Sequence, residues 1–249
     1  MAAALACAVF TTHGAETKDG WRVLPLIKDG KASPDWVQVG YGGMVVDGDA
    51  LRTECVPEGL GLLVYQKERL GNCQVRVVFK AKDERANAGV YVRLADGILD
   101  RVGKPGPAFK RDAAGEPSAE SMERVKAAAE RDEGAWYAVH HGYEIQIAGG
   151  GDEFHRTGAV YSLAPSKKGK KGPGEWQEMI ITLAGERITV DLDGERVTSL
   201  DLASKDLPER KAWHEPKRET KRPQAGYLGL QNHDPGDVVW FKEVSVRRN

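Results

Sequence analysis

The stretch GYEIQIAGGGDEFHRTGAVY, residues 142–161, decides the fold prediction. Apolar and polar residues alternate over its first third, which is the period of a half-buried β-strand. Because successive side chains of a strand point to opposite faces, Glu144 and Gln146 should share one face of a sheet. The apolar residues beside them, among them Ile145, should then point into a core. We therefore predict an antiparallel strand at Gly142–Ile147.

A second strand is predicted at Ala159–Tyr161, after a polar loop that contains Arg156. A carboxylate and an amide on one sheet face, close to an arginine and a tyrosine, are typical of a groove for a polar ligand. The alternative is a solvated outer face on which Glu144 and Gln146 have no partner. Residues outside this stretch favour the groove.

The same stretch contains GGDEF at Gly150–Phe154, the signature of diguanylate cyclases. Those enzymes carry the motif in a mixed α/β domain with further acidic residues for metal. Here the flanking segments are strand-like, and no alternation of helices and strands surrounds the motif. We interpret the five letters as a coincidental loop without nucleotide chemistry.

The remaining chain is rich in short alternating segments, which predicts an all-β fold. Strands are expected at Val37–Tyr41, Met44–Val46, Ala50–Val56, Gly61–Tyr65, Cys73–Lys80, Ala88–Leu94, Trp176–Leu183, Arg187–Leu192, Arg196–Leu200, Tyr227–Gln231 and Val238–Val246. One helix is predicted at Ser118–Arg131, within a long excursion, Gly97–Gly134, that should lie outside the sheets. This pattern predicts a jelly-roll antiparallel β-sandwich.

Charge and hydropathy exclude some functional classes. The 249 residues include 36 Lys and Arg against 37 Asp and Glu, a formal net charge of −1, so no overall nucleic-acid footprint is expected. No run of about twenty apolar residues occurs, so no membrane span is predicted. The chain is long enough to bury a core without disulfide support.

Residues 1–15 resemble a secretory signal, although a positive leading segment is missing. We expect an exported protein, periplasmic or extracellular, in which residues 16–249 form a single jelly-roll domain. In an oxidising compartment Cys55 and Cys73 could form a disulfide, or both could be buried free thiols.

The order of several motifs resembles that of the 3-keto-disaccharide hydrolase family, whose fold is similar to that of concanavalin A-type lectins and glucanases. The motifs are GYEIQI, RTGAVY, GEWQ (Gly174–Gln177), LDG (Leu192–Gly194), GYLGLQNH (Gly226–His233) and VVWFKEVSV (Val238–Val246). The resemblance runs from about Trp21 to Val246. It implies a sugar ligand and a carbohydrate-active enzyme. The opening segment LIKDGKASPDW, Gln177 and Asp193 depart from the family pattern.

A 3-keto substrate changes the chemistry that the site needs. Ordinary glycosidases use two carboxylates across the scissile bond, and Glu144 has no second acid at a suitable spacing on its strand. A ketone at C3 acidifies the C2 hydrogen, so one base can start elimination of the C1 leaving group, after which water can add. Such a path needs a base, a donor for the enolate oxygen and an acid for the leaving group.

Each role has candidate residues. The base is Glu144 or His233, the enolate is stabilised by Arg93 or Arg156, the leaving group takes a proton from Tyr161 or His141, Gln146 and Gln231 bind hydroxyls, and Trp136 or Trp240 stacks on a sugar ring. A divalent metal is possible, but His140 and His141, if adjacent on a strand, point apart and make poor joint ligands. A non-catalytic carbohydrate-binding module that uses the same groove is the alternative function.

Overall fold

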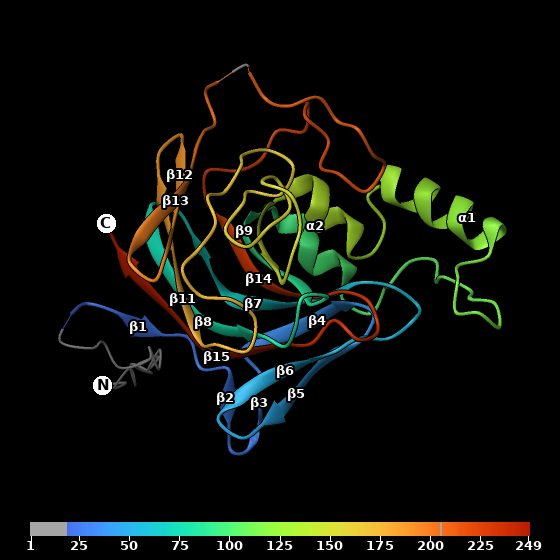
Figure 1. Ribbon diagram of the computed structural model, residues 1–249, viewed down its shortest axis with the longest axis horizontal. Coiled ribbons are helices and arrows are strands. Elements are labelled where there is room, and N and C mark those ends of the chain that lie inside the picture. Colours follow the sequence, from blue (N-terminus) through green and yellow to red (C-terminus); the bar gives the residue numbers. More distant parts are fainter. Residues whose placement is uncertain (1–18, 205) are drawn as a thin grey trace, which may run out of the picture.

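The alternating segments pair into two antiparallel sheets that pack face to face in the computed structural model of the protein (Figure 1), which describes residues 19–204 and 206–249. The larger sheet has the order β13 (Glu195–Asp201), β12 (Arg187–Leu192), β11 (Gln177–Ala184), β8 (Cys73–Ala81), β15 (Val239–Arg248), β6 (Ala50–Glu54) and β5 (Gly43–Asp47), with β1 (Arg22–Val23) paired to β15. The smaller sheet has the order β10 (Tyr143–Ala148), β9 (Asn87–Leu94), β14 (Gly226–Asn232), β7 (Gly61–Leu70) and β4 (Trp36–Gly40), and β2 (Ile27–Lys28) and β3 (Lys31–Ala32) form a separate hairpin. The predicted jelly-roll sandwich is confirmed.

The main core lies between the two sheets. Val75, Val77 and Phe79 of β8 point into it from the larger sheet, and Ile145 and Ile147 of β10 point into it from the smaller one. All five are fully buried, and each contributes about 1.5–3 kcal/mol of transfer free energy. The alternation in the sequence therefore describes both strands correctly, and it leaves Glu144 and Gln146 on the other face of the smaller sheet.

A second apolar cluster covers part of that other face. Leu62 and Val64 of β7 pack there against α2 (Trp136–His141) and the 3-10 helix η1 (Asp96–Arg101), chiefly through Val139 and Ile98. Figure 1 shows α2 beside β9 and β14. The helix thus forms one wall above the sheet, and the uncovered part of the face next to it is available for a ligand.

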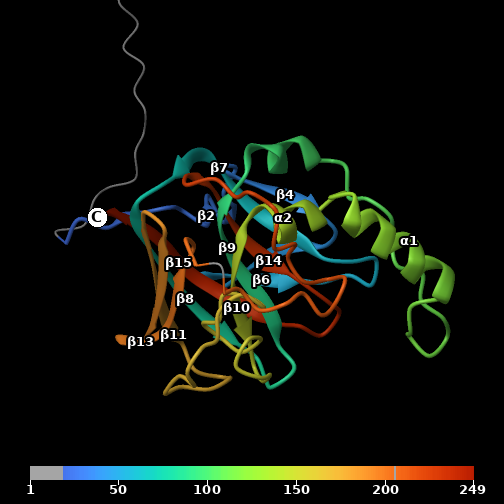
Figure 2. The same ribbon diagram turned by 90° about the horizontal axis from the view of Figure 1, so that it is seen from above.

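The helix α1 (Ala119–Glu130) lies outside the two sheets, as predicted (Figure 2). Its N-cap is Ser118, whose Oγ accepts a hydrogen bond from the backbone N–H of Ser121 at 3.3 Å. The expectation of a single helix is wrong, because α2 and η1 also form. His140 and His141 therefore lie on a helix and not on a strand. Packing of Val139 into the second cluster outweighs the strand preference of this aromatic and β-branched segment.

The segment Ala159–Tyr161 is not a strand, although it pairs with β10. Gln146 N donates to Ala159 O, and Tyr161 N donates to Glu144 O, each at 2.9 Å. The pairing ends because Ser162 adopts the left-handed conformation, with φ at +55°, and turns the chain away. The predicted second strand is thus reduced to an isolated bridge at Val160.

Cys55 and Cys73 are both free thiols. Cys73 pairs with Arg248 at one end of β15, whereas Arg52, three residues before Cys55, pairs with Trp240. Eight residues of β15 separate the two positions, roughly 26 Å of strand. The two thiols therefore lie too far apart for a disulfide.

The signal-like segment, residues 1–15, falls outside the described residues. Within the described ranges, no helix has the length and apolar character that crossing a membrane requires.

Candidate active site

A polar pocket opens on the outer face of the smaller sheet, beside α2. Its wall is formed by Leu60, Asn87, Trp136, Val139, Glu144, Gln146, Tyr161, His214, Gln231 and His233. Most of these residues come from β9, β10, β14, α2 and the excursion 203–225, and Leu60, Tyr161 and His233 come from connecting segments. The pocket therefore exists only in the folded chain. Six of the ten residues predicted for the site line it.

Glu144 lies at the base of the pocket and is 8% exposed. The hydroxyl of Tyr91, its neighbour on β9, donates to Glu144 Oε2 at 2.6 Å, and Gln231 Nε2 donates to the same hydroxyl at 3.4 Å. Burial raises the pKa of Glu144 to about 7, because the charged carboxylate is removed from water. A carboxyl group with this pKa can accept or donate a proton near neutral pH.

The space for this carboxylate depends on Gly89. A Cβ added at Gly89 would lie 2.4 Å from Glu144 Oε1 and 2.8 Å from its Cγ. Any side chain there would displace Glu144 from its hydrogen bond with Tyr91. Gly89 therefore has a positional role at the site.

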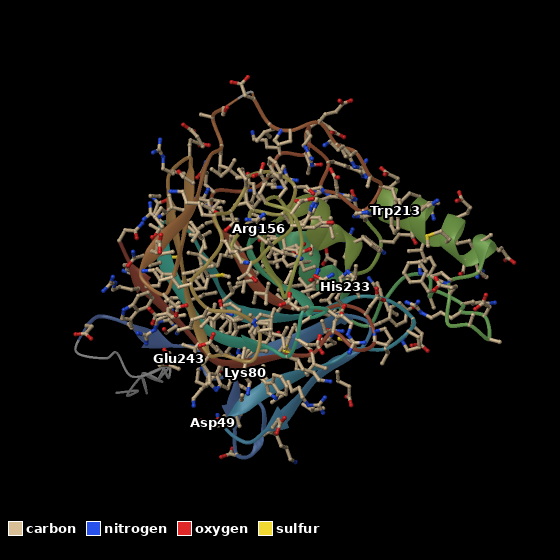
Figure 3. All side chains as sticks on the ribbon, in the orientation of Figure 1. Asp49, Lys80, Arg156, Trp213, His233 and Glu243 are labelled. Atoms are coloured by element: carbon tan, nitrogen blue, oxygen red, sulfur yellow. The ribbon has the colours of Figure 1, made fainter. Side chains whose placement is uncertain are left out.

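His233 directly follows β14 and lines the pocket; Figure 3 labels its side chain. Its Nδ1 lies 3.2 Å from Asp237 Oδ2 and 3.4 Å from Asp234 Oδ2. Burial lowers the pKa of His233, but the hydrogen bonds and charges of the two aspartates outweigh burial and raise the pKa to about 9. His233 is thus a cation at neutral pH, and its charge in turn favours the ionised form of Glu144.

Tyr161 and His214 form a second pair at the rim, with Tyr161 Oη 2.9 Å from His214 Nδ1. Burial and the charge of Glu144 raise the pKa of Tyr161, so the phenol keeps its proton. Burial lowers the pKa of His214, so the imidazole is neutral. The pair can hold and move one proton at the entrance of the pocket.

Two amide side chains present unpaired acceptors to a ligand. Gln146 Nε2 donates to Asn87 Oδ1 at 2.9 Å, which fixes the amide, but Gln146 Oε1 has no hydrogen-bond partner among the described residues. Gln231 Oε1 is equally without a partner in that part of the chain. Buried acceptors of this kind are costly unless a donor reaches them, and sugar hydroxyls are such donors. Trp136, whose ring centroid lies 5.0 Å from that of Trp213, adds an aromatic wall.

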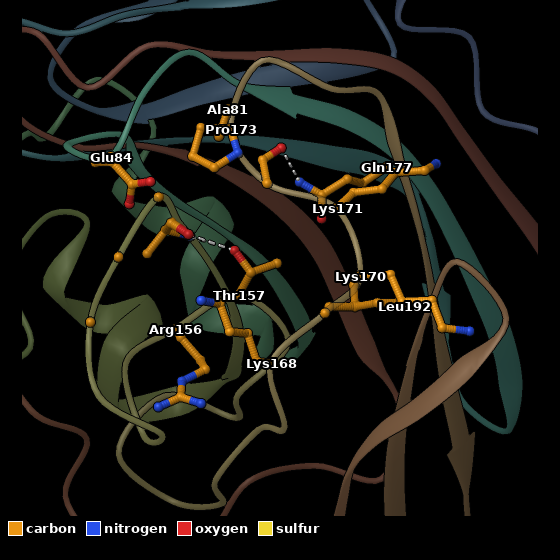
Figure 4. A pocket seen from close by; sticks show the side chains of 16 residues that line it. Ala81, Glu84, Arg156, Thr157, Lys168, Lys170, Lys171, Pro173, Gln177 and Leu192 are labelled. Atoms are coloured by element: carbon orange, nitrogen blue, oxygen red, sulfur yellow. Dashed lines mark hydrogen bonds between the residues drawn. The ribbon is translucent and has the colours of Figure 1, made fainter.

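Four predicted site residues lie outside the pocket, and His141 and Arg156 are two of them. His141 faces Asp132, with Nε2 3.0 Å from Oδ2, and its ring stacks on Tyr137. Arg156 lines a different hollow, with Thr157, Lys168 and the Gly149–Gly151 loop, and its Nε donates to Asp152 O (Figure 4). Neither residue lines the pocket that contains Glu144.

Arg93 is diverted by a β-bulge. Between Tyr91 and Leu94, β9 contains one more residue than the facing segment of β14, Tyr227 to Gly229. Arg93 lies within this bulge and has φ at +52°. Tyr91 and Leu94 therefore share a face, and Arg93 leaves it for a separate cavity. The predicted place for Arg93, at the edge of the ligand face, is wrong for this reason.

Trp240 lies on the outer face of the larger sheet. Its indole N–H donates to Asp47 Oδ2 at 2.8 Å, and Nζ of Lys80 lies 4.7 Å from its ring centroid. It is therefore no sugar-stacking residue of the pocket. GGDEF forms a turn after β10 that Asp152 stabilises by accepting from Phe154 N at 2.8 Å. The all-β surroundings agree with its interpretation as a loop.

Tyr91, Asn87 and His214 were not predicted as site residues, although Asn87 and His214 line the pocket and Tyr91 binds Glu144. A signal for the first two exists, because strand alternation places Asn87, Gly89 and Tyr91 on one face of β9, and β9 pairs with β10. His214 lies in the long excursion 203–225, and nothing local in the sequence indicates that this segment returns to the pocket.

A metal site was considered at His233, Asp234 and Asp237, whose ligand atoms lie within 4.8 Å of one another. The donors are already engaged: Asp237 Oδ2 accepts from Asp234 N at 3.0 Å, and Asp234 Oδ1 accepts from Arg111 Nη2 at 2.9 Å. His233 Nδ1 points at the same carboxylates at hydrogen-bond distance, which fits a proton on Nδ1. These residues do not fit a metal, and the divalent metal that the sequence analysis allowed stays a prediction without a site.

The chain matches one family model and resembles several solved structures. Residues 18–247 match the family model described as a 3-keto-alpha-glucoside-1,2-lyase-like domain. Two candidate glycosyl hydrolases from Parabacteroides distasonis ATCC 8503 have similar structures: one is 22% identical, with a TM-score of 0.57 over 92% of this chain and 99% of that one. The other is 16% identical, with a TM-score of 0.61 over 95% and 99%.

The carbohydrate-binding module CBM66 from Bacillus subtilis is 10% identical, with a TM-score of 0.51 over 90% of this chain and 99% of that one. At these identities the likeness concerns the fold alone. No curated protein matches the chain.

Proposed function

The chain belongs to the family of 3-keto-alpha-glucoside-1,2-lyase-like domains, and from this premise we propose that it is a carbohydrate-active enzyme that cleaves 3-keto-glycosides. The proposed reaction removes the C2 proton, expels the C1 leaving group and, when water adds, amounts to hydrolysis. One observation carries the proposal: a buried carboxylate with a pKa of about 7, Glu144, shares a pocket with a cationic His233.

The composition of the pocket supports elimination over ordinary glycoside hydrolysis. Glu144 is the one carboxylate among the residues that line it. A glycosidase of the usual kind needs a second carboxylate across the scissile bond, as acid, base or nucleophile. A ketone at C3 removes that requirement, because it makes the C2 hydrogen acidic enough for a single base.

The residues then have distinct roles. Glu144 takes the proton from C2, and the electron pair moves to the C3 oxygen as an enolate. The imidazolium of His233 stabilises the negative charge on that oxygen. When the C3 carbonyl forms again, the C1–C2 double bond forms and the C1–oxygen bond breaks. Tyr161 donates a proton to the leaving oxygen, and exchange with solvent restores Tyr161 and Glu144.

The test is incubation with a panel of 3-keto-α-glucosides and 3-keto-β-glucosides, followed by mass spectrometry. We expect release of the free aglycone together with an unsaturated 3-keto sugar or its hydrate. The matched control is the same glucoside with a hydroxyl at C3, which should not react because its C2 hydrogen is not acidic. Binding of the panel without any cleavage would contradict the proposal and indicate a carbohydrate-binding module.

We expect kcat/KM to rise with pH up to about pH 7 and to fall above about pH 9. Glu144 must be ionised to accept a proton, so activity is lost as the pH falls below its pKa. His233 must keep its proton, so activity is lost as the pH rises through its pKa. The measurement is kcat/KM from about pH 5 to about pH 10, which reports the free enzyme. A flat profile around pH 7 would exclude Glu144 as the base.

Gln146→Ala should raise KM and leave kcat nearly unchanged. The change removes a positioned amide whose Oε1 has no hydrogen-bond donor among the described residues. Loss of one hydrogen bond to a ligand should raise KM roughly tenfold. The control is Gln66→Ala, whose Nε2 donates to Pro34 O on the surface. A large drop in kcat with constant KM would instead place Gln146 in the chemical step.

A further inference from the structure

A second cavity of about 460 Å³ lies at another end of the sandwich, under the excursion 203–225. Arg93 and Tyr143 border it from the smaller sheet, and Arg222 borders it from the excursion. None of its lining residues belongs to the pocket of Glu144. The cavity therefore has no part in the reaction proposed above.

The guanidinium of Arg93 is buried at this cavity, and two of its nitrogen donors have no hydrogen-bond partner among the described residues. Arg93 is 1% exposed, and its Nη2 donates to Gly185 O at 2.8 Å. Its Nε and Nη1 have no hydrogen-bond partner among residues 19–204 and 206–249. Buried charged donors without hydrogen-bond partners are unfavourable, and an anion in the cavity would satisfy them.

The charges around Arg93 leave an excess of positive charge. Lys221 and Arg222 also border the cavity, and Glu186 is an acid on the same wall. Arg218 also lines the cavity, but its Nη2 forms a salt bridge with Glu215 Oε2 at 2.9 Å. Arg222 donates to the backbone oxygens of Gly142, Thr220 and Lys217, which fixes its position, and its guanidinium lies 5.1 Å from the centroid of the Tyr143 ring. No carboxylate among the described residues forms a salt bridge with it.

Four leucines form an apolar part of the cavity wall. Leu163, Leu200, Leu202 and Leu207 line it, and the first two are 4% and 5% exposed. A free inorganic ion would leave this wall without contacts, whereas a ligand with a short hydrocarbon body would cover it.

We propose that this cavity binds a small amphiphilic oxyanion, with its carboxylate or phosphate on Arg93 and its apolar body against Leu163 and Leu200. The proposal does not rest on the reaction assigned to Glu144. It rests on Nε and Nη1 of Arg93, which have no partner among the described residues, and on the leucines that line the same cavity. Carboxylate and phosphate are both oxyanions that arginine binds through charge-assisted hydrogen bonds.

The test uses three probes on the full chain: hexanoate, hexanol and inorganic phosphate. Binding is measured by isothermal calorimetry and by the rise in Tm, since a ligand that binds only the folded state stabilises it. We expect saturable binding of hexanoate, weaker binding of phosphate, and none of hexanol at the same concentrations. Equal binding of hexanoate and hexanol, or no binding of hexanoate, would overturn the proposal.

Two variants locate the site. Arg93→Gln should weaken hexanoate binding by roughly ten- to a hundred-fold, the loss of hydrogen bonds to a charged group. Leu207→Trp, at a half-buried position of the excursion, should fill the cavity and abolish binding even if Arg93→Gln fails to fold. The control is Lys28→Gln, which removes an exposed charge in β2. Unchanged hexanoate binding in Leu207→Trp would overturn the proposal.

Discussion

Glu144→Gln should lower kcat/KM on a 3-keto-glucoside by roughly a hundred- to ten-thousand-fold. Glutamine keeps the shape of the side chain, and its Oε1 can still accept the hydrogen bond from Tyr91. It cannot take the proton from C2. KM should change little, because Gln146, Gln231 and Trp136 still line the pocket. The measurement is kcat and KM on the substrate that the panel identifies.

Stability separates this effect from unfolding. Burial raises the pKa of Glu144 from 4.5 to about 7, so the ionised carboxylate destabilises the folded state at higher pH. A neutral glutamine removes that cost, and Tm should therefore not fall. The matched control is Glu120→Gln on α1, where the carboxylate is 84% exposed and far from the pocket. Full activity of Glu144→Gln would show that another group removes the proton.

Local alternation was sufficient to predict the central part of the site. It placed Glu144 and Gln146 on one face of β10 and directed Ile145 and Ile147 into the core, and the structure has both arrangements. Side chains alternate along a strand with a period of two, so burial of Ile145 and Ile147 on one face fixes Glu144 and Gln146 on the other. The prediction that Gln231 and His233 share a site with Glu144 came from the family resemblance. No local rule of the sequence predicts that β14 pairs with β9.

The errors have specific physical causes. One added residue in β9 turns Arg93 away from the face that holds Tyr91, and a bulge of this kind has no clear signature in AGVYVRL. Trp136–His141 forms a helix because its apolar side packs on the sheet, which propensity alone does not predict. His214 reaches the pocket from a long excursion, and such long-range returns depend on the whole fold.

His233→Ala should lower kcat/KM by a similar factor, roughly a hundred- to ten-thousand-fold, and should remove the alkaline limb of the pH profile. The imidazolium is held by Asp234 and Asp237, and nothing else that lines the pocket carries a positive charge at neutral pH. Without it the enolate oxygen loses the cation that stabilises it. Added imidazole should restore part of the activity, because the space left by the ring can admit it.

Asp237→Asn tests the same assignment while the ring stays in place. Loss of this carboxylate removes one of the two charges that raise the pKa of His233, so the fall in kcat/KM should begin below about pH 9. The rising limb near pH 7 should persist or move slightly upward, because the charge of His233 favours the ionised Glu144. Asp49→Asn, which breaks only a surface pair with Lys242, is the control. If the alkaline limb does not move in Asp237→Asn, that limb belongs to another group, and His233 is not the cation that stabilises the enolate.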